Sequence, residues 1–298
     1  MIVTKLIGGL GNQMFQYAAG KALADFHQTS LFLDLSAYKA EPNVAYTNRN
    51  YELGIFNLQA LQASQSELDY FLKENNKLQR IIARYFPKTQ KKMVLNEYGH
   101  LFYDEFFNCP KDTYLNGFWQ CEKYFSSIRP SLLKDFTIKD VIPEKILEIQ
   151  NKIKSSAAVS IHVRRGDYVN LKSASDFHGA CSLNYYEKAH AFLKDKFENF
   201  NLFIFSDDIA WCKQNFSFQN MHFIEQQHGP HWDMFLMSFC NHNIIANSSF
   251  SWWGAWLNEN ENKSVVLPDF WFRNVKTESL GIKPDNWILI EEKDNLFD

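Results

Sequence analysis

The sequence has no CxxC pair, no long apolar run and no surplus of basic residues. Its five cysteines are scattered and odd in number, which argues against a disulfide framework or a cysteine-based zinc site and predicts reduced thiols in a cytoplasmic protein. A net charge of −3 argues against a nucleic-acid partner, because no basic surplus is available to neutralise a phosphate backbone. No apolar run approaches the roughly 18 residues of a membrane span, and no signal-peptide pattern is present. We therefore expect a soluble protein.

Length and patterning predict two α/β domains. The chain has 298 residues, 46% of them hydrophobic, which is enough for two domains of about 150 residues each. Short apolar runs of strand type alternate with segments of helical spacing in both halves, a pattern typical of parallel sheets covered by helices. We predict two doubly wound, Rossmann-like domains facing a cleft, comprising residues 1–153 and 154–298.

The first half opens with a predicted strand, a glycine loop, a helix and a second strand. Gly9 and Gly11 begin a dinucleotide-binding fingerprint, but Met14 stands where the third glycine is required. Asp34 lies about where a ribose-binding carboxylate would follow. A nucleotide-dependent oxidoreductase therefore stays open as an alternative.

The second half contains most of the predicted strands, at residues 157–163, 202–205, 221–224, 243–246, 265–267 and 287–290. Helical spacing is found near residues 183–197 and 232–240 and again from Phe250 onward. Ligands bind beyond the carboxyl ends of the strands in such sheets. The polar residues that follow these strands are therefore the candidate site.

Two adjacent arginines follow the first of these strands, within the sequence HVRRGDY. Arg164 and Arg165 come directly after the apolar run that contains His162, and Gly166 and Asp167 follow. A guanidinium group carries a permanent charge and a planar fork that matches phosphate oxygens. The pair predicts a phosphate-binding site; a structural Arg–Asp ion pair is the alternative.

Two further strand ends carry polar residues. Asp207 and Asp208 follow residues 202–205, where a carboxylate can accept from a guanine edge or a ribose; helix capping is an equally good interpretation. Ser248 and Ser249, with the backbone of Phe250, stand where a strand turns into a helix, and free N–H groups at a helix start bind anions. The tryptophans that follow are expected to belong to the core.

Two segments of the first half are ambiguous. The stretch GFWQCEKYF, residues 117–125, is either a buried aromatic turn or a wall that meets a sugar, with Trp119 and Gln120 as candidates. Lys88, Lys91 and Lys92 form a basic run, which we expect to be a solvated loop. Weak attraction of this run to an anionic membrane surface is the alternative.

Taken together, the motifs resemble those of the bacterial α-1,2-fucosyltransferases, glycosyltransferase family 11. The resemblance rests on GGLGNQMFQYA, GFWQCEKYF, HVRRGDY, SDD and NSSFSWWGAW, which occur in the family's order from residue 2 to residue 268. It implies a GT-B fold with an N-terminal acceptor domain and a C-terminal domain that binds GDP-fucose. The implied reaction is inverting transfer of L-fucose to the 2-hydroxyl of a terminal galactose, as in lipopolysaccharide O-antigen synthesis, without an essential metal or cofactor.

The resemblance also implies roles for individual residues. Arg164 resembles the arginine that holds the donor diphosphate, and Arg165 would support it or the loop. The Asp207–Asp208 pair would face the guanine or ribose, while Ser248, Ser249 and Phe250 would bind phosphate. Asn12 and Gln13 resemble a Gly-Asn-Gln element that reaches the cleft from the first domain.

The reaction needs two kinds of group. Negative charge that develops on the leaving diphosphate requires a fixed cation and helix-start amides in the absence of a metal. A base must take the proton of the attacking hydroxyl, and Asp167 and His162 are the candidates, with Asp167 slightly favoured.

Three alternatives remain open. They are another sugar-nucleotide transferase, an oxidoreductase, and a non-catalytic carbohydrate-binding protein that uses its aromatic surface. The acceptor is open as well: lactose-type, N-acetyllactosamine-type and lipid-linked glycans all fit a galactose-terminated partner.

Overall fold

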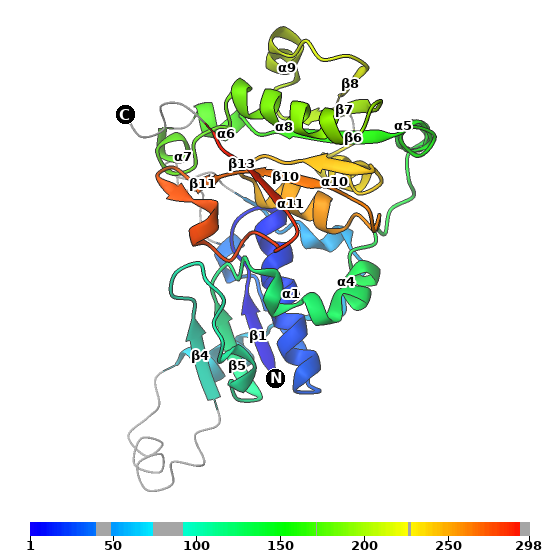
Figure 1. Cartoon of the computed structure of the whole chain (residues 1–298). Coiled ribbons are helices and arrows are strands. Elements are labelled where there is room, and N and C mark those ends of the chain that lie inside the picture. The colour runs from blue at the N-terminus through cyan, green and yellow to red at the C-terminus, as the bar shows by residue number, and fades with distance from the viewer. Residues whose placement is uncertain (40–48, 74–91, 171, 226–227, 293–298) are drawn as a thin grey trace, which may run out of the picture. The chain divides into compact units, whose positions relative to one another are not determined.

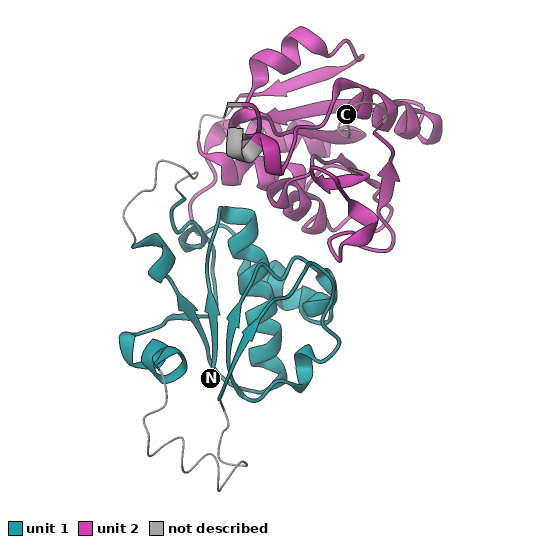
Figure 2. Ribbon diagram, turned by 90° about the vertical axis from the view of Figure 1, so that its left-hand side faces the viewer, with its two compact units in different colours: residues 1–43, 48–139 teal, residues 44–47, 140–298 magenta. Residues whose placement is uncertain are grey.

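The computed structural model describes residues 1–39, 49–73, 92–170, 172–225 and 228–292. The described chain falls into two compact units, the first ending at Lys139 and the second beginning at Asp140 (Figure 2). Each unit is built on its own parallel sheet, as the order of elements in Figure 1 shows. The predicted fold class, two parallel α/β sheets, is confirmed.

The division of the chain lies before the residue 153 expected from the sequence. The segment from Pro143 onward forms helix α5 (Glu144–Lys154), which packs against α10 (Pro230–Met237) of the second unit. Its apolar face therefore covers the second unit, and the connection between the units precedes the helix.

The first unit contains a five-stranded sheet in the order β3-β2-β1-β5-β4, parallel throughout. The strands are β1 (Ile2–Lys5), β2 (Leu31–Asp34), β3 (Leu61–Gln62), β4 (Lys92–Asn96) and β5 (Asp112–Asn116). The helices are α1 (Leu10–Phe26), α2 (Gln65–Leu72) and α4 (Arg129–Asp135). The opening strand, helix and strand agree with the sequence prediction, whereas β4 and β5 were not predicted. The lysines at positions 88 and 91 lie outside the described residues.

The second unit contains a six-stranded parallel sheet in the order β13-β10-β9-β6-β7-β8. Its strands are β6 (Ala158–Val163), β7 (Asn201–Ser206), β8 (Met221–Ile224), β9 (His242–Ile244), β10 (Val265–Pro268) and β13 (Ile288–Ile290). Besides α5 and α10, its helices are α6 (Gly166–Asn170), α7 (Lys172–Phe177), α8 (Leu183–Lys196), α9 (Ile209–Asn215) and α11 (Ser249–Trp256). A small antiparallel pair, β11 (Phe270–Phe272) and β12 (Val275–Lys276), completes it.

The core of the second unit explains why these segments form strands. Every residue of β6 is buried, and the apolar side chains of β6 and β7 pack against α8. Strands that are buried on both faces are rich in apolar residues. The apolar residues at 157–163 and 202–205 are the signal from which these two strands were predicted. Figure 1 shows α8 on one side of this sheet and α10 and α11 on the other. Because the strands are parallel, their carboxyl ends lie along the same edge of this sheet.

Candidate active site

The three polar segments predicted to bind a ligand follow three neighbouring strands. Strand β6 lies between β7 and β9, with Val163 opposite Ser206 and Ile161 opposite Ile244. The chain runs from β6 outward through β7 and β8, and then returns to the other side of β6 with β9. The strand order therefore reverses between β6 and β9, and such a switch point is where open α/β sheets bind ligands.

Arg164 and Asp207 form an ion pair at this edge. Arg164 Nη1 lies 2.9 Å from Asp207 Oδ2, and each side chain keeps about a quarter of its surface exposed, 25% and 22%. The Arg164 guanidinium carbon also lies 5.7 Å from the centre of the Tyr168 ring. Because the pair is only partly buried, the guanidinium is held in one place and still faces solvent.

Arg165 is held by different partners. Its backbone N–H donates to Asp207 Oδ1 at 2.8 Å, while its Nε lies 3.4 Å from Asp208 Oδ2. Its guanidinium carbon stands 4.2 Å from the centre of the Trp211 ring, a cation–π distance. The other oxygen of Asp208 accepts from the Trp211 N–H and caps α9. Both aspartates therefore have structural roles. Asp207 binds the arginine loop, and Asp208 contacts Arg165 and caps α9.

Gly166 permits this arrangement. A β-carbon at this position would lie 2.7 Å from Asp207 Oδ2 and 3.1 Å from its Cγ. A side chain on residue 166 would therefore displace the carboxylate that holds both arginines.

The two candidate bases differ in what the structure shows. Asp167 lies in α6, and its side chain is outside the described part of the structure. His162 is 5% exposed on β6, and its Nδ1 has no hydrogen-bond partner among the described residues. Burial, reinforced by the Arg164 charge and opposed by Asp207, lowers the pKa of His162 to about 4. The imidazole is therefore neutral near pH 7 and is only a weak base.

The start of α11 lies beside the end of β6. Ser248 is the N-cap, and its side chain makes no capping hydrogen bond, so the first-turn N–H groups of the helix have no acceptor from it. The Phe250 ring lies 5.5 Å from the His162 ring, which places this helix start next to the arginine strand. Ser249 and Phe250 are partly exposed, whereas the three tryptophans of the helix are buried, as predicted.

The structure brings two of the predicted residues of the first unit together. Gln120 Nε2 donates to Asn12 Oδ1 at 2.8 Å, joining the loop after β5 to the start of α1. Gln13 is fully buried, and its amide bonds the carbonyls of Gly8 and Asn50 and the N–H of Glu52. Gln13 therefore holds the glycine loop in place, and Asn12 is the more accessible of the two.

Two other candidates of the first unit are buried. Asp34 is 1% exposed; its oxygens accept from the Tyr114 hydroxyl at 2.6 Å and the Ser36 N–H at 2.8 Å, which leaves no free carboxylate for a ribose. Trp119 is 1% exposed and packs against Phe106 and Tyr124.

Sequence reasoning missed two aromatic residues of the site. Trp211 and Tyr168 lie beneath the guanidinium groups of Arg165 and Arg164. Tyr168 could have been found from its place in HVRRGDY. Trp211 gave no signal beyond standing three residues after Asp208.

Further features of the chain concern metals, membranes and thiols. In the described residues no three His, Cys, Asp or Glu side chains gather as a metal-binding cluster would. Within the same part of the chain, none of the helices has the length and apolar character to span a bilayer. All five cysteines are buried and unpaired.

The fold is that of an α/β protein in which two arginines and a helix start lie at a topological switch point. Comparison with known proteins is more specific. Residues 54–291 match the glycosyl transferase family 11 description. The chain is 36% identical to the alpha-1,2-colitosyltransferase of Escherichia coli, over 98% of this chain and 99% of that one. The chain belongs to glycosyltransferase family 11.

Two other relatives widen the comparison. The O-antigen biosynthesis glycosyltransferase WbnK of Escherichia coli is 36% identical, over 95% of this chain and 98% of that one. Galactoside alpha-(1,2)-fucosyltransferase 2 of Rattus norvegicus is 27% identical, over 55% of this chain and 50% of its own length. The family predicted from the motifs is thus confirmed.

Proposed function

We propose that this chain is an inverting galactoside α-1,2-fucosyltransferase that moves L-fucose from GDP-fucose to the 2-hydroxyl of a terminal β-galactoside. The observation that carries the proposal is the Arg164–Asp207 pair beside the start of α11, in a family 11 chain. On this proposal the second unit binds the donor and the first unit binds the acceptor glycan. The first unit contributes three residues to the substrate site on this proposal: Asn12, Gln13 and Gln120.

The donor diphosphate takes its place among the arginines and the helix start. When the bond between C1 of fucose and the β-phosphate oxygen breaks, negative charge develops on the diphosphate. Arg164 offers its fork to that charge, and the first-turn N–H groups at Ser249 and Phe250 provide fixed donors. Asp207 acts as a positioning residue, because its carboxylate holds the Arg164 side chain and the Arg165 backbone. Asp208 lies beside Arg165 and caps α9.

The acceptor hydroxyl loses its proton as it attacks C1 from the face opposite the diphosphate. His162 is nearly closed to solvent and its pKa is lowered to about 4, which makes it a poor proton acceptor. We assign the base to Asp167, in the turn directly after the arginines.

The first test is a GDP-release assay with GDP-fucose and lactose in the presence of EDTA. Arg164→Ala removes the fork and is expected to lower turnover by about 100- to 1,000-fold, the cost of losing one oxyanion donor. Arg164→Lys is expected to recover little, because an ammonium group lacks the planar fork. Arg273→Ala, an exposed arginine of the same unit, is the matched control.

The outcomes separate the alternatives. Lactose-dependent release by wild type and by the control, with a new α-1,2 linkage seen by NMR, supports donor, reaction and metal independence together. Near-normal turnover of Arg164→Ala would overturn the phosphate-binding role. Galactoside binding with no GDP binding in calorimetry would favour the carbohydrate-binding alternative.

A second donor is favoured by one observation, the 36% identity over nearly the whole chain to an alpha-1,2-colitosyltransferase. Colitose is L-fucose without its 3-hydroxyl group. Running the assay with both GDP sugars decides between them. A site built to bond the 3-hydroxyl would reject the deoxy sugar strongly, whereas a site without such a contact would accept both.

A further inference from the structure

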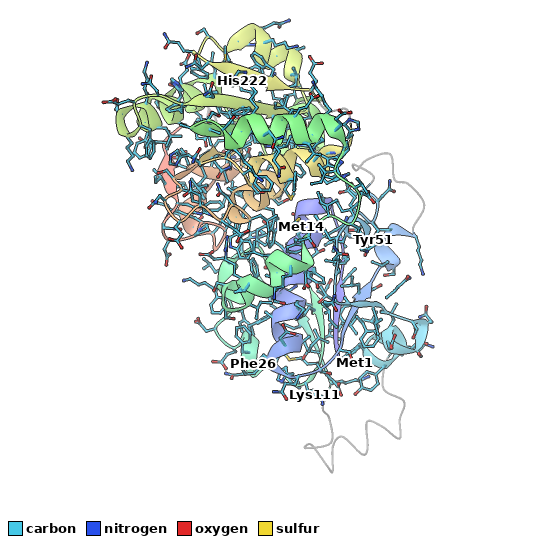
Figure 3. All side chains as sticks on the ribbon, turned by 90° about the vertical axis from the view of Figure 1, so that its right-hand side faces the viewer. Met1, Met14, Phe26, Tyr51, Lys111 and His222 are labelled. Atoms are coloured by element: carbon cyan, nitrogen blue, oxygen red, sulfur yellow. The ribbon has the colours of Figure 1, made fainter. Side chains whose placement is uncertain are left out.

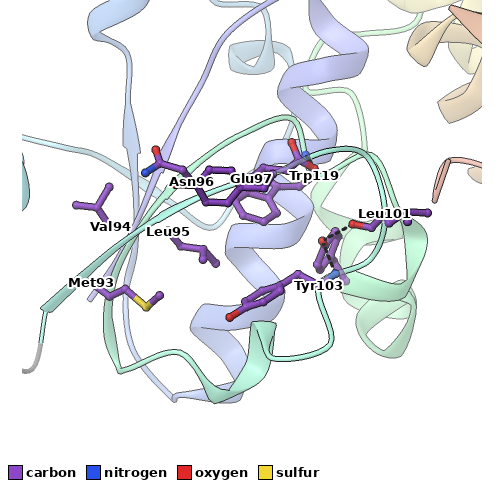
Figure 4. Close-up of a pocket in the computed structure, with 10 residues that line it drawn as sticks. Met93, Val94, Leu95, Asn96, Glu97, Leu101, Tyr103 and Trp119 are labelled. Atoms are coloured by element: carbon purple, nitrogen blue, oxygen red, sulfur yellow. Dashed lines mark hydrogen bonds between the residues drawn. The ribbon is translucent and has the colours of Figure 1, made fainter. Parts of the chain in front are cut away.

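A cavity of about 250 Å³ lies in the first unit, along the edge strand β4 and beside the loop that follows it. Figure 4 shows the residues that line it. They are Met93, Val94, Leu95, Asn96, Glu97, Tyr98, Leu101, Tyr103, Trp119 and Tyr124. The first four belong to β4, and the others follow β4 or β5 in the chain.

A half-buried carboxylate and an indole form one wall. Glu97 accepts the backbone N–H groups of Phe118 and Trp119 at 2.6 and 3.0 Å. These bonds hold Trp119 in the left-handed backbone region, at φ +56°. Gly117 allows the approach, since a β-carbon there would lie 2.4 Å from Glu97 Cβ. The turn after β5 is therefore built around the Glu97 side chain.

Trp119 carries a polar atom that no described residue satisfies. Its side chain is 1% exposed, and its buried indole Nε1 has no hydrogen-bond partner in the described part of the chain. A buried donor without a partner costs about 1–3 kcal/mol. A ligand hydroxyl that reaches this nitrogen, after a small opening of the wall, recovers that cost.

The rim is made of exposed aromatic and apolar side chains. Tyr98 is 89% exposed, Leu101 62% and Tyr103 41%. Large apolar side chains gathered at one exposed place indicate an interaction site rather than chance surface composition. Phenol rings offer a flat face and a hydroxyl at once.

Size and charge restrict the ligand. The volume falls below the roughly 300–1,000 Å³ of pockets that hold drug-sized ligands, which favours a ligand smaller than a nucleotide. Among the ten lining residues there is no lysine or arginine, and Glu97 is acidic, which disfavours a phosphate or a carboxylate. A carboxylate, an amide and phenols in the lining disfavour a purely hydrocarbon chain. A neutral ring with an apolar face and several hydroxyls satisfies all of these conditions.

We propose that this cavity binds one sugar ring of the galactose-terminated acceptor, an inference that rests on the proposed function. The apolar face of the pyranose packs on Tyr98 and Tyr103, and its hydroxyls bond Glu97 and the Trp119 indole N–H. Tyr98 and Tyr103 are therefore acceptor-specificity residues that act in binding, not in the chemistry.

The kinetic test substitutes the two tyrosines at the rim of the cavity. Tyr98→Ala and Tyr103→Ala are each expected to raise the acceptor KM about tenfold, the size of one lost aromatic contact. The KM for GDP-fucose is expected to stay unchanged, and Tyr98→Phe should keep most of the binding because it keeps the ring. Phe26→Ala is the matched control, an aromatic 59% exposed at the far end of α1 (Figure 3). Acceptor KM values equal to that of the control would overturn the proposal.

A spectroscopic test does not depend on transfer. Methyl β-D-galactoside and lactose are titrated into the ¹⁵N-labelled protein, and the Trp119 indole resonance is identified by its loss in Trp119→Phe. A saturable shift in wild type, weakened in Tyr98→Ala and Tyr103→Ala, supports the cavity even if the chain transfers no fucose, in which case the proposed function alone fails. No shift, or a shift with a short-chain phospholipid and not with sugar, overturns the cavity assignment.

Discussion

At the scale of single residues, the site depends on one carboxylate that serves two arginines. Asp207 bonds the Arg164 side chain through one oxygen and the Arg165 backbone through the other. Asp207→Asn keeps the shape but removes the charge, so the Arg164 fork is released from its position. We expect kcat to fall by about 100-fold, the cost of misplacing a catalytic group by an ångström. Steady-state kinetics at saturating acceptor measure it.

Asp208→Asn provides the matched control for that prediction. Asp208 lies 3.4 Å from Arg165 Nε and caps α9, but it makes no ion pair with Arg164 in the described residues. An asparagine at an N-cap is as good as an aspartate. The control should therefore retain most of its activity. Equal losses in the two variants would mean that the Arg164 pair has no special role.

Residue types at the site were readable from the sequence, but their pairing was not. Two arginines after a strand predict an anion site from local order alone. The bonds that fix them join positions about 43 apart in the chain, such as Arg164 to Asp207. That pairing depends on β6 and β7 lying side by side, which periodicity does not encode. For the same reason Asp207 and Asp208 could not be assigned to a guanine or to the arginines from sequence.

At the scale of elements, an added negative charge at the start of α11 tests whether a diphosphate binds there. Ser249 is the first residue of the helix, where an acidic side chain favours the helix dipole by about 0.3–1 kcal/mol. Ser249→Asp should therefore keep or raise thermal stability. The same charge repels a diphosphate held there, so GDP affinity should fall by about tenfold.

Calorimetry with two ligands separates charge from shape in this variant. Guanosine carries no phosphate, so its affinity should be equal in wild type and in Ser249→Asp. Ser249→Ala, a neutral change at the same position, should bind GDP nearly as wild type does. A variant that loses guanosine and GDP affinity alike would indicate a distorted site instead of repulsion.

Strands in which apolar residues predominate were predictable, and more evenly mixed ones were not. Strand β8 was predicted with its bounds, and β6 and β7 within one residue at each end, because most residues of MHFI, AVSIHV and NLFIFS are apolar. Strands β4 and β5 were missed, since KMVLN and DTYLN each mix polar and apolar residues over five positions. Their place is set by long-range pairing of β5 with β1 and of β4 with β5. The cavity along β4 was therefore beyond sequence reasoning, although Trp119 had been singled out.

At the scale of the whole molecule, buried and half-buried histidines couple stability to pH. His162, His190, His222, His231 and His242 of the second unit all have pKa values lowered chiefly by burial. A group whose pKa falls on folding takes up protons more readily in the unfolded chain. Its stabilising contribution is complete above the unfolded pKa near 6.5 and is lost as the pH falls toward the folded value. The second unit should therefore be labile to mild acid.

His162 supplies a measurable share of that lability. With a folded pKa of about 4, it accounts for about 2 kcal/mol of lost stability between pH 7 and pH 5. His162→Gln removes the titrating group, so the variant should lose about that much less than wild type over the same interval. Urea unfolding followed by tryptophan fluorescence measures it, because seven of the eight tryptophans lie in the second unit. Equal losses in the two proteins would place the acid sensitivity in the other histidines and would mean that the His162 imidazole is protonated in the folded chain far above pH 4.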